Sequence, residues 1–212
     1  MKLLISLSLL VASSLCSQGA IASPKGSTPE PTAQSVHFFK KQVRRSSFNN
    51  ALKGLINRYP HKTAEFVSIA LTAYPKNYKE IITTSVSTQP TYVDEIIILA
   101  NEYKVASPTE IVKLAISAEP SYASLATSAA CEYSPEEFSE IVKAAVNIEP
   151  DSADQIAQKL VSAYPSKTME ILITTIKEVP LVGKYVLDAL LATVNDDEIK
   201  SESMIIISVE QL

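Results

Sequence analysis

Residues 134–150 have the sequence SPEEFSEIVKAAVNIEP, and residues 106–120 have the sequence ASPTEIVKLAISAEP. In both segments a Ser-Pro pair precedes a Glu-Ile-Val-Lys motif, which begins at Glu140 in the first and at Glu110 in the second. An internal repeat outranks other sequence signals, because it predicts a fold built from similar stacked units.

Proline spacing gives the length of a smaller unit. Eight prolines fall on one 15-residue register: Pro60, Pro75, Pro90, Pro120, Pro135, Pro150, Pro165 and Pro180. The gap in this series falls at Val105, and Pro108 follows shortly afterwards. Because proline inside a helix costs about 3 kcal/mol, each proline is predicted to mark a break between elements.

The residues between prolines follow a helical period. With each proline, or Val105, counted as position 0, apolar residues recur at positions 3, 6, 7, 10 and 11, and position 10 is mostly small. This spacing places the apolar side chains on one face of a helix, whereas a strand would need strict alternation. Each unit is therefore predicted to be a helix of about 11–12 residues.

The starts of these helices also have sequence signals. Ser107 and Ser134 are each followed by proline, with Glu110 and Glu137 at the third position after the serine. This arrangement predicts a capping box, with serine as the N-cap and proline as the first helical residue. Three further pairs have the same spacing: Asn77 with Glu80, Thr91 with Asp94, and Asp151 with Asp154.

Alternate helices resemble each other more than adjacent ones do, so the true unit is a 30-residue pair of helices. Short helices with one apolar stripe must stack on neighbours to bury it. We predict an all-α fold, an α-solenoid of about five αα-hairpins, in a repeat domain at residues 35–194. The architecture is similar to tetratricopeptide and HEAT arrays, whose periods of about 34 and 40 residues differ. No functional residue is therefore transferred from those groups.

Residues 1–22 have the features of an export signal peptide. Lys2 precedes an apolar run at residues 3–15, and Ala-Ile-Ala ends at Ala22, which is a small-residue cleavage site. Cleavage after Ala22 predicts a secreted or periplasmic protein, and the lack of Asn-X-Ser/Thr sites agrees with a bacterial source. A membrane span and lipidation of Cys16 are the alternatives.

The flanks of the repeat domain differ from it in composition. Residues 23–34 are polar and rich in proline, and are predicted to be a disordered leader. Residues 195–212 begin with three acids near Asn195 and contain the apolar segment MIIIS. They are predicted to be a C-terminal capping helix or an apolar tail. No later segment is long and apolar enough to predict a transmembrane helix in the mature chain.

Charge is unevenly distributed along the chain. Residues 23–79 carry ten Lys/Arg and two acids, whereas residues 80–212 carry eight Lys/Arg and 21 acids. The segment HFFKKQVRRSSF at residues 37–48, interpreted as a helix, places four cations at i,i+4 spacing: Lys40, Lys41, Arg44 and Arg45. These cations could contact an anionic lipid or polysaccharide, contact a second copy head to tail, or simply belong to the first helix. Nucleic acid is not expected as a partner of an exported acidic protein.

Four glutamates are the most regular polar feature, and they recur with the 30-residue period of the helix pairs: Glu80, Glu110, Glu140 and Glu170. This glutamate row is predicted to follow one edge of the array. It could meet a basic partner or cations. The alternative is a purely structural role, because a carboxylate in the first turn stabilises a helix by about 0.3–1 kcal/mol.

The residues that usually carry chemistry are few. His37 and His61 belong to no recognisable catalytic or metal motif, and the glycines are too scattered for a phosphate-binding loop. Cys131 occupies an apolar position of the repeat, which predicts a buried thiol. We therefore predict no catalytic, cofactor or metal site. The expected function is that of an exported, non-enzymatic scaffold for a protein or peptide. The alternative is attachment to an anionic envelope surface through residues 37–45, and self-association into a homo-oligomer is a further hypothesis.

Overall fold

The computed structural model describes residues 31–180, and every regular element among them is helical. The predicted signal peptide, its cleavage site, most of the leader, the repeat residues after 180 and the C-terminal cap lie outside these residues. Ten α-helices are described: α1 Ala33–Val43, α2 Phe48–Arg58, α3 Thr63–Ala73, α4 Tyr78–Thr88, α5 Val93–Glu102, α6 Pro108–Ala118, α7 Ala123–Tyr133, α8 Phe138–Ile148, α9 Ala153–Ala163 and α10 Thr168–Glu178. Successive helices begin at equal intervals along the chain.

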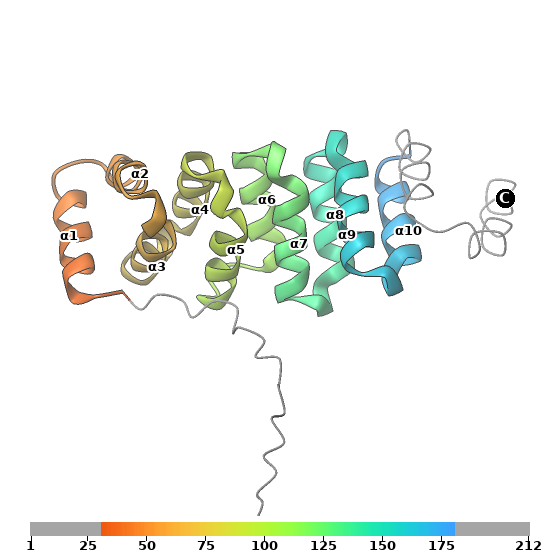
Figure 1. Ribbon diagram of the computed structural model, residues 1–212, viewed down its shortest axis with the longest axis horizontal. Helices are drawn as coiled ribbons and strands as arrows, with labels where there is room; N and C mark the ends of the chain where they lie inside the picture. Colours follow the sequence, from red (N-terminus) through yellow and green to blue (C-terminus); the bar gives the residue numbers. More distant parts are fainter. Residues whose placement is uncertain (1–30, 181–212) are drawn as a thin grey trace, which may run out of the picture.

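The helices form an elongated array of two layers (Figure 1). One layer contains the even-numbered helices, in which α2, α4, α6, α8 and α10 pack in sequence, and the other contains the odd-numbered helices. Each helix also packs against its chain neighbours in the opposite layer. The predicted all-α solenoid of paired helices is confirmed. Helix α1 begins at Ala33, slightly before the predicted start of the repeat domain at residue 35.

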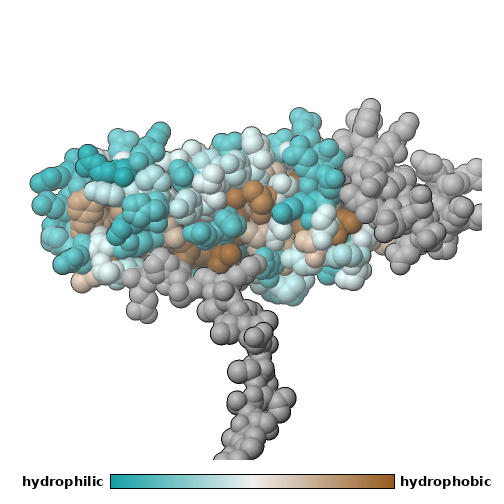
Figure 2. Space-filling view, in the orientation of Figure 1, coloured by the Kyte–Doolittle hydropathy of each residue, from teal (hydrophilic) through white to brown (hydrophobic). Residues whose placement is uncertain are grey.

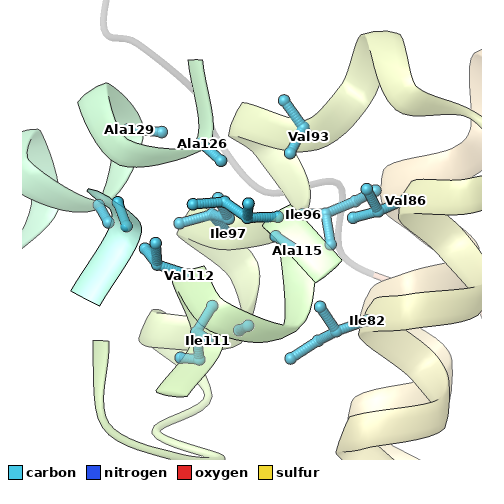
Figure 3. Packing of buried hydrophobic residues seen from close by; sticks show 14 of the residues in the cluster. Ile82, Val86, Val93, Ile96, Ile97, Ile111, Val112, Ala115, Ala126 and Ala129 are labelled. Carbon is cyan, nitrogen blue, oxygen red and sulfur yellow. The ribbon is translucent and has the colours of Figure 1, made fainter. Parts of the chain in front are cut away.

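The core is a continuous apolar seam between the two layers (Figure 3). Positions 6 and 7 fill it with Ile82 in α4, Ile97 in α5 and Val112 in α6, and none of these is exposed. Each large side chain buried in this way contributes about 1.5–3 kcal/mol. Position 10 holds buried alanines, whose small size allows neighbouring helix axes to approach closely. They are Ala70, Ala100, Ala115, Ala130 and Ala145.

Proline begins a short 3₁₀ turn before seven of the helices. The residue preceding each of these seven prolines has φ between −125° and −151°, since proline disfavours helical geometry in the residue before it. The amide of the third turn residue donates to the carbonyl of the residue before proline, at 2.9–3.2 Å in all seven turns. The predicted breaks at proline are therefore confirmed.

The cap predicted at Ser134 is wrong, because the helix starts later than expected. Ser134 precedes the turn Pro135–Glu137, its side chain makes no capping bond, and α8 begins at Phe138. The amide of Glu137 donates to the carbonyl of Ser134 instead. Likewise, no side-chain cap bond forms at the helices preceded by the other predicted pairs. Within the described array, side chains cap the three helices that lack a 3₁₀ turn: α1 by Thr32, α2 by Ser47 and α6 by Ser107.

The connection between α5 and α6 explains the gap in the proline series. Lys104 adopts a left-handed conformation with φ 50°, its amide donates to Asn101, and the amide of Val105 donates to Ala100. These two bonds form a Schellman motif, which usually has glycine at the left-handed position. Ser107 then caps α6, and Pro108 is its first residue. The interval between the starts of α5 and α6 is therefore the same as between other successive helices, although this connection has no 3₁₀ turn.

Replacement of Lys104 by glycine is expected to stabilise the protein. A left-handed residue with a Cβ atom is disfavoured by about 1–2 kcal/mol, and glycine removes that cost while adding some chain entropy to the unfolded state. Lys104→Gly should raise the unfolding midpoint, measured by circular dichroism, by about 2–4 °C for a net gain of about 1 kcal/mol. Lys159→Gly, at an exposed position inside α9, should lower it by a similar amount. A lower midpoint for Lys104→Gly would contradict this account of the connection.

Candidate functional site

The predicted basic segment forms one end of the array but is not a single helix. Lys40 and Lys41 lie in the last turn of α1, Arg44 is its C-cap, and Arg45 lies in the loop before α2. The prediction of i,i+4 pairs along one helix is therefore wrong for Lys41 and Arg45, because α1 ends at Val43. All four cations are exposed, and none forms a salt bridge within residues 31–180. We call these four residues the basic end.

The apolar face of α1 is already used inside the protein. Phe39 is fully buried, and its ring centroid lies 6.1 Å from that of Phe48 and 6.2 Å from that of Tyr74. A helix that lies in a membrane interface must present such a face to the lipid. Attachment of residues 37–45 to an anionic surface would therefore depend on their charges.

One shallow hollow lies beside α1. It has a volume of about 240 Å³ and is lined by Gln34, Ser35, Phe38, Tyr59, Lys62 and Phe66. Small-molecule sites usually enclose about 300–1,000 Å³ and contain convergent polar groups. The hollow is smaller than this, and its one charged lining residue, Lys62, is paired with Glu65 at 3.2 Å.

Two of the four glutamates in the row, Glu110 and Glu170, join neighbouring helices of the even layer. The Tyr78 hydroxyl donates to Glu110 Oε1 at 2.8 Å, and Lys79 Nζ lies 3.0 Å from the same oxygen, so that α4 is tied to α6. The Ser139 hydroxyl donates to Glu170 and ties α8 to α10.

The other two glutamates of the row make no such bridge between helices. Glu80 accepts a bond of 3.4 Å from Asn77 at the start of its own helix. Glu140 is exposed and has no ion pair among the described residues. The row is therefore not one continuous acidic surface.

The same contacts set the protonation of these carboxyls. The hydrogen bond from Tyr78, followed by the one from Lys79, lowers the pKa of Glu110. The bond from Ser139 is the main cause of the lowered pKa of Glu170. A carboxyl whose pKa is lowered on folding stabilises the protein at pH above its unfolded pKa of about 4.3. That contribution disappears as the pH falls through the lowered value.

The surfaces of the two layers differ in charge. Helices α4, α6 and α8 of the even layer each contain one acid and one lysine, whereas α5 and α7 of the odd layer together contain four acids and no Lys/Arg. In Figure 2 hydrophilic side chains surround a small apolar patch at the α1–α2 end of the array, and apolar side chains also reach the surface over its middle. The odd layer is therefore both acidic and apolar at its centre.

Four large apolar side chains of the odd layer are exposed: Tyr103, whose hydroxyl bonds to that of Ser68, and three others in α5 and α7. The exposed fractions are 36% for Ile98, 41% for Leu125 and 40% for Tyr133. Ile98 and Tyr133 occupy the repeat positions held one helix pair earlier by Ser68 and Tyr103, whose hydroxyls bond at 2.6 Å from neighbouring helices of this layer. By repeat equivalence, we expect Ile98 and Tyr133 to lie near each other between α5 and α7. We call Asp94, Glu95 and these three apolar residues the α5–α7 ridge.

The sequence prediction missed this ridge, although alignment of the repeats contains a signal for it. At position 5 of α3, α5, α7 and α9 the residues are Glu65, Glu95, Leu125 and Gln155, and at position 8 they are Ser68, Ile98, Ser128 and Gln158. Large apolar residues replace polar ones only in α5 and α7 of these four helices. The first cause of the raised pKa of Glu95 is its partial burial, and the second is the nearby charge of Asp94.

The described residues contain no group of three or more histidine, cysteine, aspartate or glutamate side chains that could hold a metal ion. Cys131 is buried as predicted, and burial raises the pKa of its thiol to about 12. A thiol in this state is a poor nucleophile, because the thiolate is the reactive form. Within residues 31–180, no helix has the length and apolar character needed to span a bilayer.

Comparison of the chain with protein-family models, curated proteins and solved structures finds no match. Any functional inference must therefore come from the surface that the repeats themselves create.

Glu110→Gln should lower the unfolding midpoint at neutral pH. The substitution removes the negative charge that pairs with Lys79 and that strengthens the hydrogen bond from the Tyr78 hydroxyl. Glu140→Gln is the matched control and should lower the midpoint less, because it removes the same first-turn charge but no contact with a neighbouring helix. The difference between wild type and Glu110→Gln should shrink and vanish as the pH falls through the lowered pKa of Glu110, because the wild-type carboxyl then becomes protonated. Equal effects of the two substitutions in thermal unfolding followed by circular dichroism would refute the structural role of Glu110.

Proposed function

We propose that this protein is an exported, non-enzymatic helical-repeat scaffold that binds a protein or peptide through the α5–α7 ridge. The observation that carries the proposal is the exposure of Ile98, Leu125 and Tyr133 on two helices that contain four acids and no cation. Exposed apolar groups with a polar rim are typical of protein interaction sites. The export part of the proposal rests on the sequence of residues 1–22.

The chemistry of the ridge indicates its class of partner. Asp94 and Glu95 are adjacent carboxylates, and α5 and α7 supply no lysine or arginine to neutralise them. A cationic segment would supply that charge, since an opposite charge nearby favours the ionised carboxylate. Leu125 and the Ile98–Tyr133 pair would contact apolar side chains of the same segment. The expected partner is therefore a basic segment with apolar residues among its cations.

The repeat suggests substitutions that change the ridge and preserve the fold. Ile98→Ser, Leu125→Gln and Tyr133→Ala place at each position a residue that another odd-numbered helix already has there, namely Ser68, Gln155 and Ala163. The matched control is Ile173→Lys on the even layer. Ile173 is 47% exposed and stands where Lys113 and Lys143 occur in other repeats.

The triple ridge variant should lose the partner that the wild-type protein captures. Three immobilised proteins are compared: wild type, the Ile98→Ser/Leu125→Gln/Tyr133→Ala variant and the Ile173→Lys control. Each is incubated with the proteins that the source cells secrete, and the bound proteins are identified. Circular dichroism verifies that each immobilised protein is folded. Loss of apolar anchors at an interface typically weakens binding at least about tenfold, so the same partner should be retained by wild type and the control alone. Equal recovery by the triple variant would reject the ridge as the binding surface.

A further inference from the structure

We propose that the cationic partner of the α5–α7 ridge is the basic end of a second copy of this chain, so that copies associate head to tail. This inference rests on the proposed function of the ridge and names its occupant. The cations Lys40, Lys41, Arg44 and Arg45 are exposed at one end of the array. The ridge lies at the middle of the same array.

Charge complementarity is the first argument. Residues 31–79 contain nine Lys/Arg and one acid, whereas residues 80–180 contain six Lys/Arg and 15 acids. The cations of the basic end have no salt-bridge partner in the described part of their own chain, and the same is true of the two ridge carboxylates, Asp94 and Glu95. Each surface therefore supplies the charge that the other lacks, which favours encounter and orientation.

The geometry excludes a contact within one chain. Helix α1 packs against α2 and α3, and Figure 1 shows it at the end of the array, with α3 and α4 between it and α5. The basic end of one copy therefore cannot reach its own ridge and must meet the ridge of another. Such a contact joins two different surfaces, so that it can continue from copy to copy.

The end of the array also offers apolar surface. The hollow of about 240 Å³ beside α1 is lined in part by Phe38, Tyr59 and Phe66. The partly buried rings of Phe38 and Tyr59 provide an apolar surface on the same end of the array as the cations, and the exposed Leu125 is an apolar group suited to contact it. Helix α1 and the ridge helices α5 and α7 have 10 or 11 residues each and are therefore similar in length, about 15–17 Å.

The even layer is a poorer match for the basic end. Each of α4, α6 and α8 contains a lysine as well as an acid, and Glu110 and Glu170 already accept bonds from neighbouring helices. A cation approaching this face would meet lysines as well as carboxylates. The odd layer is therefore the favoured docking face.

The test uses charge-swapped variants of the full chain, in the form isolated from cells, in sedimentation velocity. One variant carries Lys40→Glu, Lys41→Glu, Arg44→Glu and Arg45→Glu, and the other carries Asp94→Lys and Glu95→Lys. The control carries Lys113→Glu and Lys177→Glu, two exposed positions of the even layer. Circular dichroism verifies that each variant is folded.

Wild type and the control should associate at low salt at concentrations up to about 0.1 mM, and should dissociate as salt shortens the range of charge interactions. Each charge-swapped variant alone should lose association at least about tenfold. An equimolar mixture of the two variants should regain it, because the acidic end of one now matches the cationic ridge of the other.

A wild-type protein that stays monomeric at low salt would overturn this inference, as would association that survives either swap or a mixture that fails to regain it. These outcomes would not by themselves reject the proposed function of the ridge, which is tested by the triple ridge variant. If the protein is monomeric but the Ile98→Ser/Leu125→Gln/Tyr133→Ala variant still loses a captured partner, the ridge is a binding surface and the second copy is not its occupant.

Discussion

Burial of each helix's apolar stripe against the helices next to it is the interaction on which the rest of this structure depends. Helices of 10 or 11 residues are too short to be stable alone in water. Buried residues such as Ile82, Ile97 and Val112 fill one seam shared by both layers. The stability of an array built in this way is approximately a sum of local helix terms and nearest-neighbour contacts. The surface positions are consequently free to differ from repeat to repeat.

The residues at these surface positions have different roles in the two layers. In the even layer, Glu110 and Glu170 bond to Tyr78 and Ser139 on neighbouring helices, so their carboxylates support the stacking. In the odd layer, Ile98 and Leu125 occupy positions that are polar in α3 and α9. Ile148 and Ile173 of the even layer are comparably exposed, but α8 and α10 also contain lysines, whereas the charged residues of α5 and α7 are all acids. This contrast is why the odd layer is the face to which we assign binding.

The sequence allowed the array to be predicted because its signals are local. Proline restricts the residue before it wherever it occurs, and the apolar period does not depend on the partner helix. The caps at Ser134 and the other turn residues were mispredicted because a 3₁₀ turn already satisfies the amides that a side chain would otherwise cap. The prediction of a single helix across residues 37–48 was wrong because α1 ends at Val43. The ridge could not be predicted from one repeat, because its prediction requires knowledge of the positions that stay exposed when two neighbouring helices pack.

Deletion of residues 120–149 tests the nearest-neighbour account most directly. The deletion removes one hairpin, α7 and α8 with their turns, and joins Glu119 to Pro150, which recreates the Glu-Pro junction found at both sites. Helices α9 and α10 would then take the places of α7 and α8 beside α5 and α6. Circular dichroism should show unchanged helicity per residue and a cooperative transition at a lower temperature. Loss of helical structure in the shortened chain would show that the fold depends on a centre that the whole array shares, and would contradict the account.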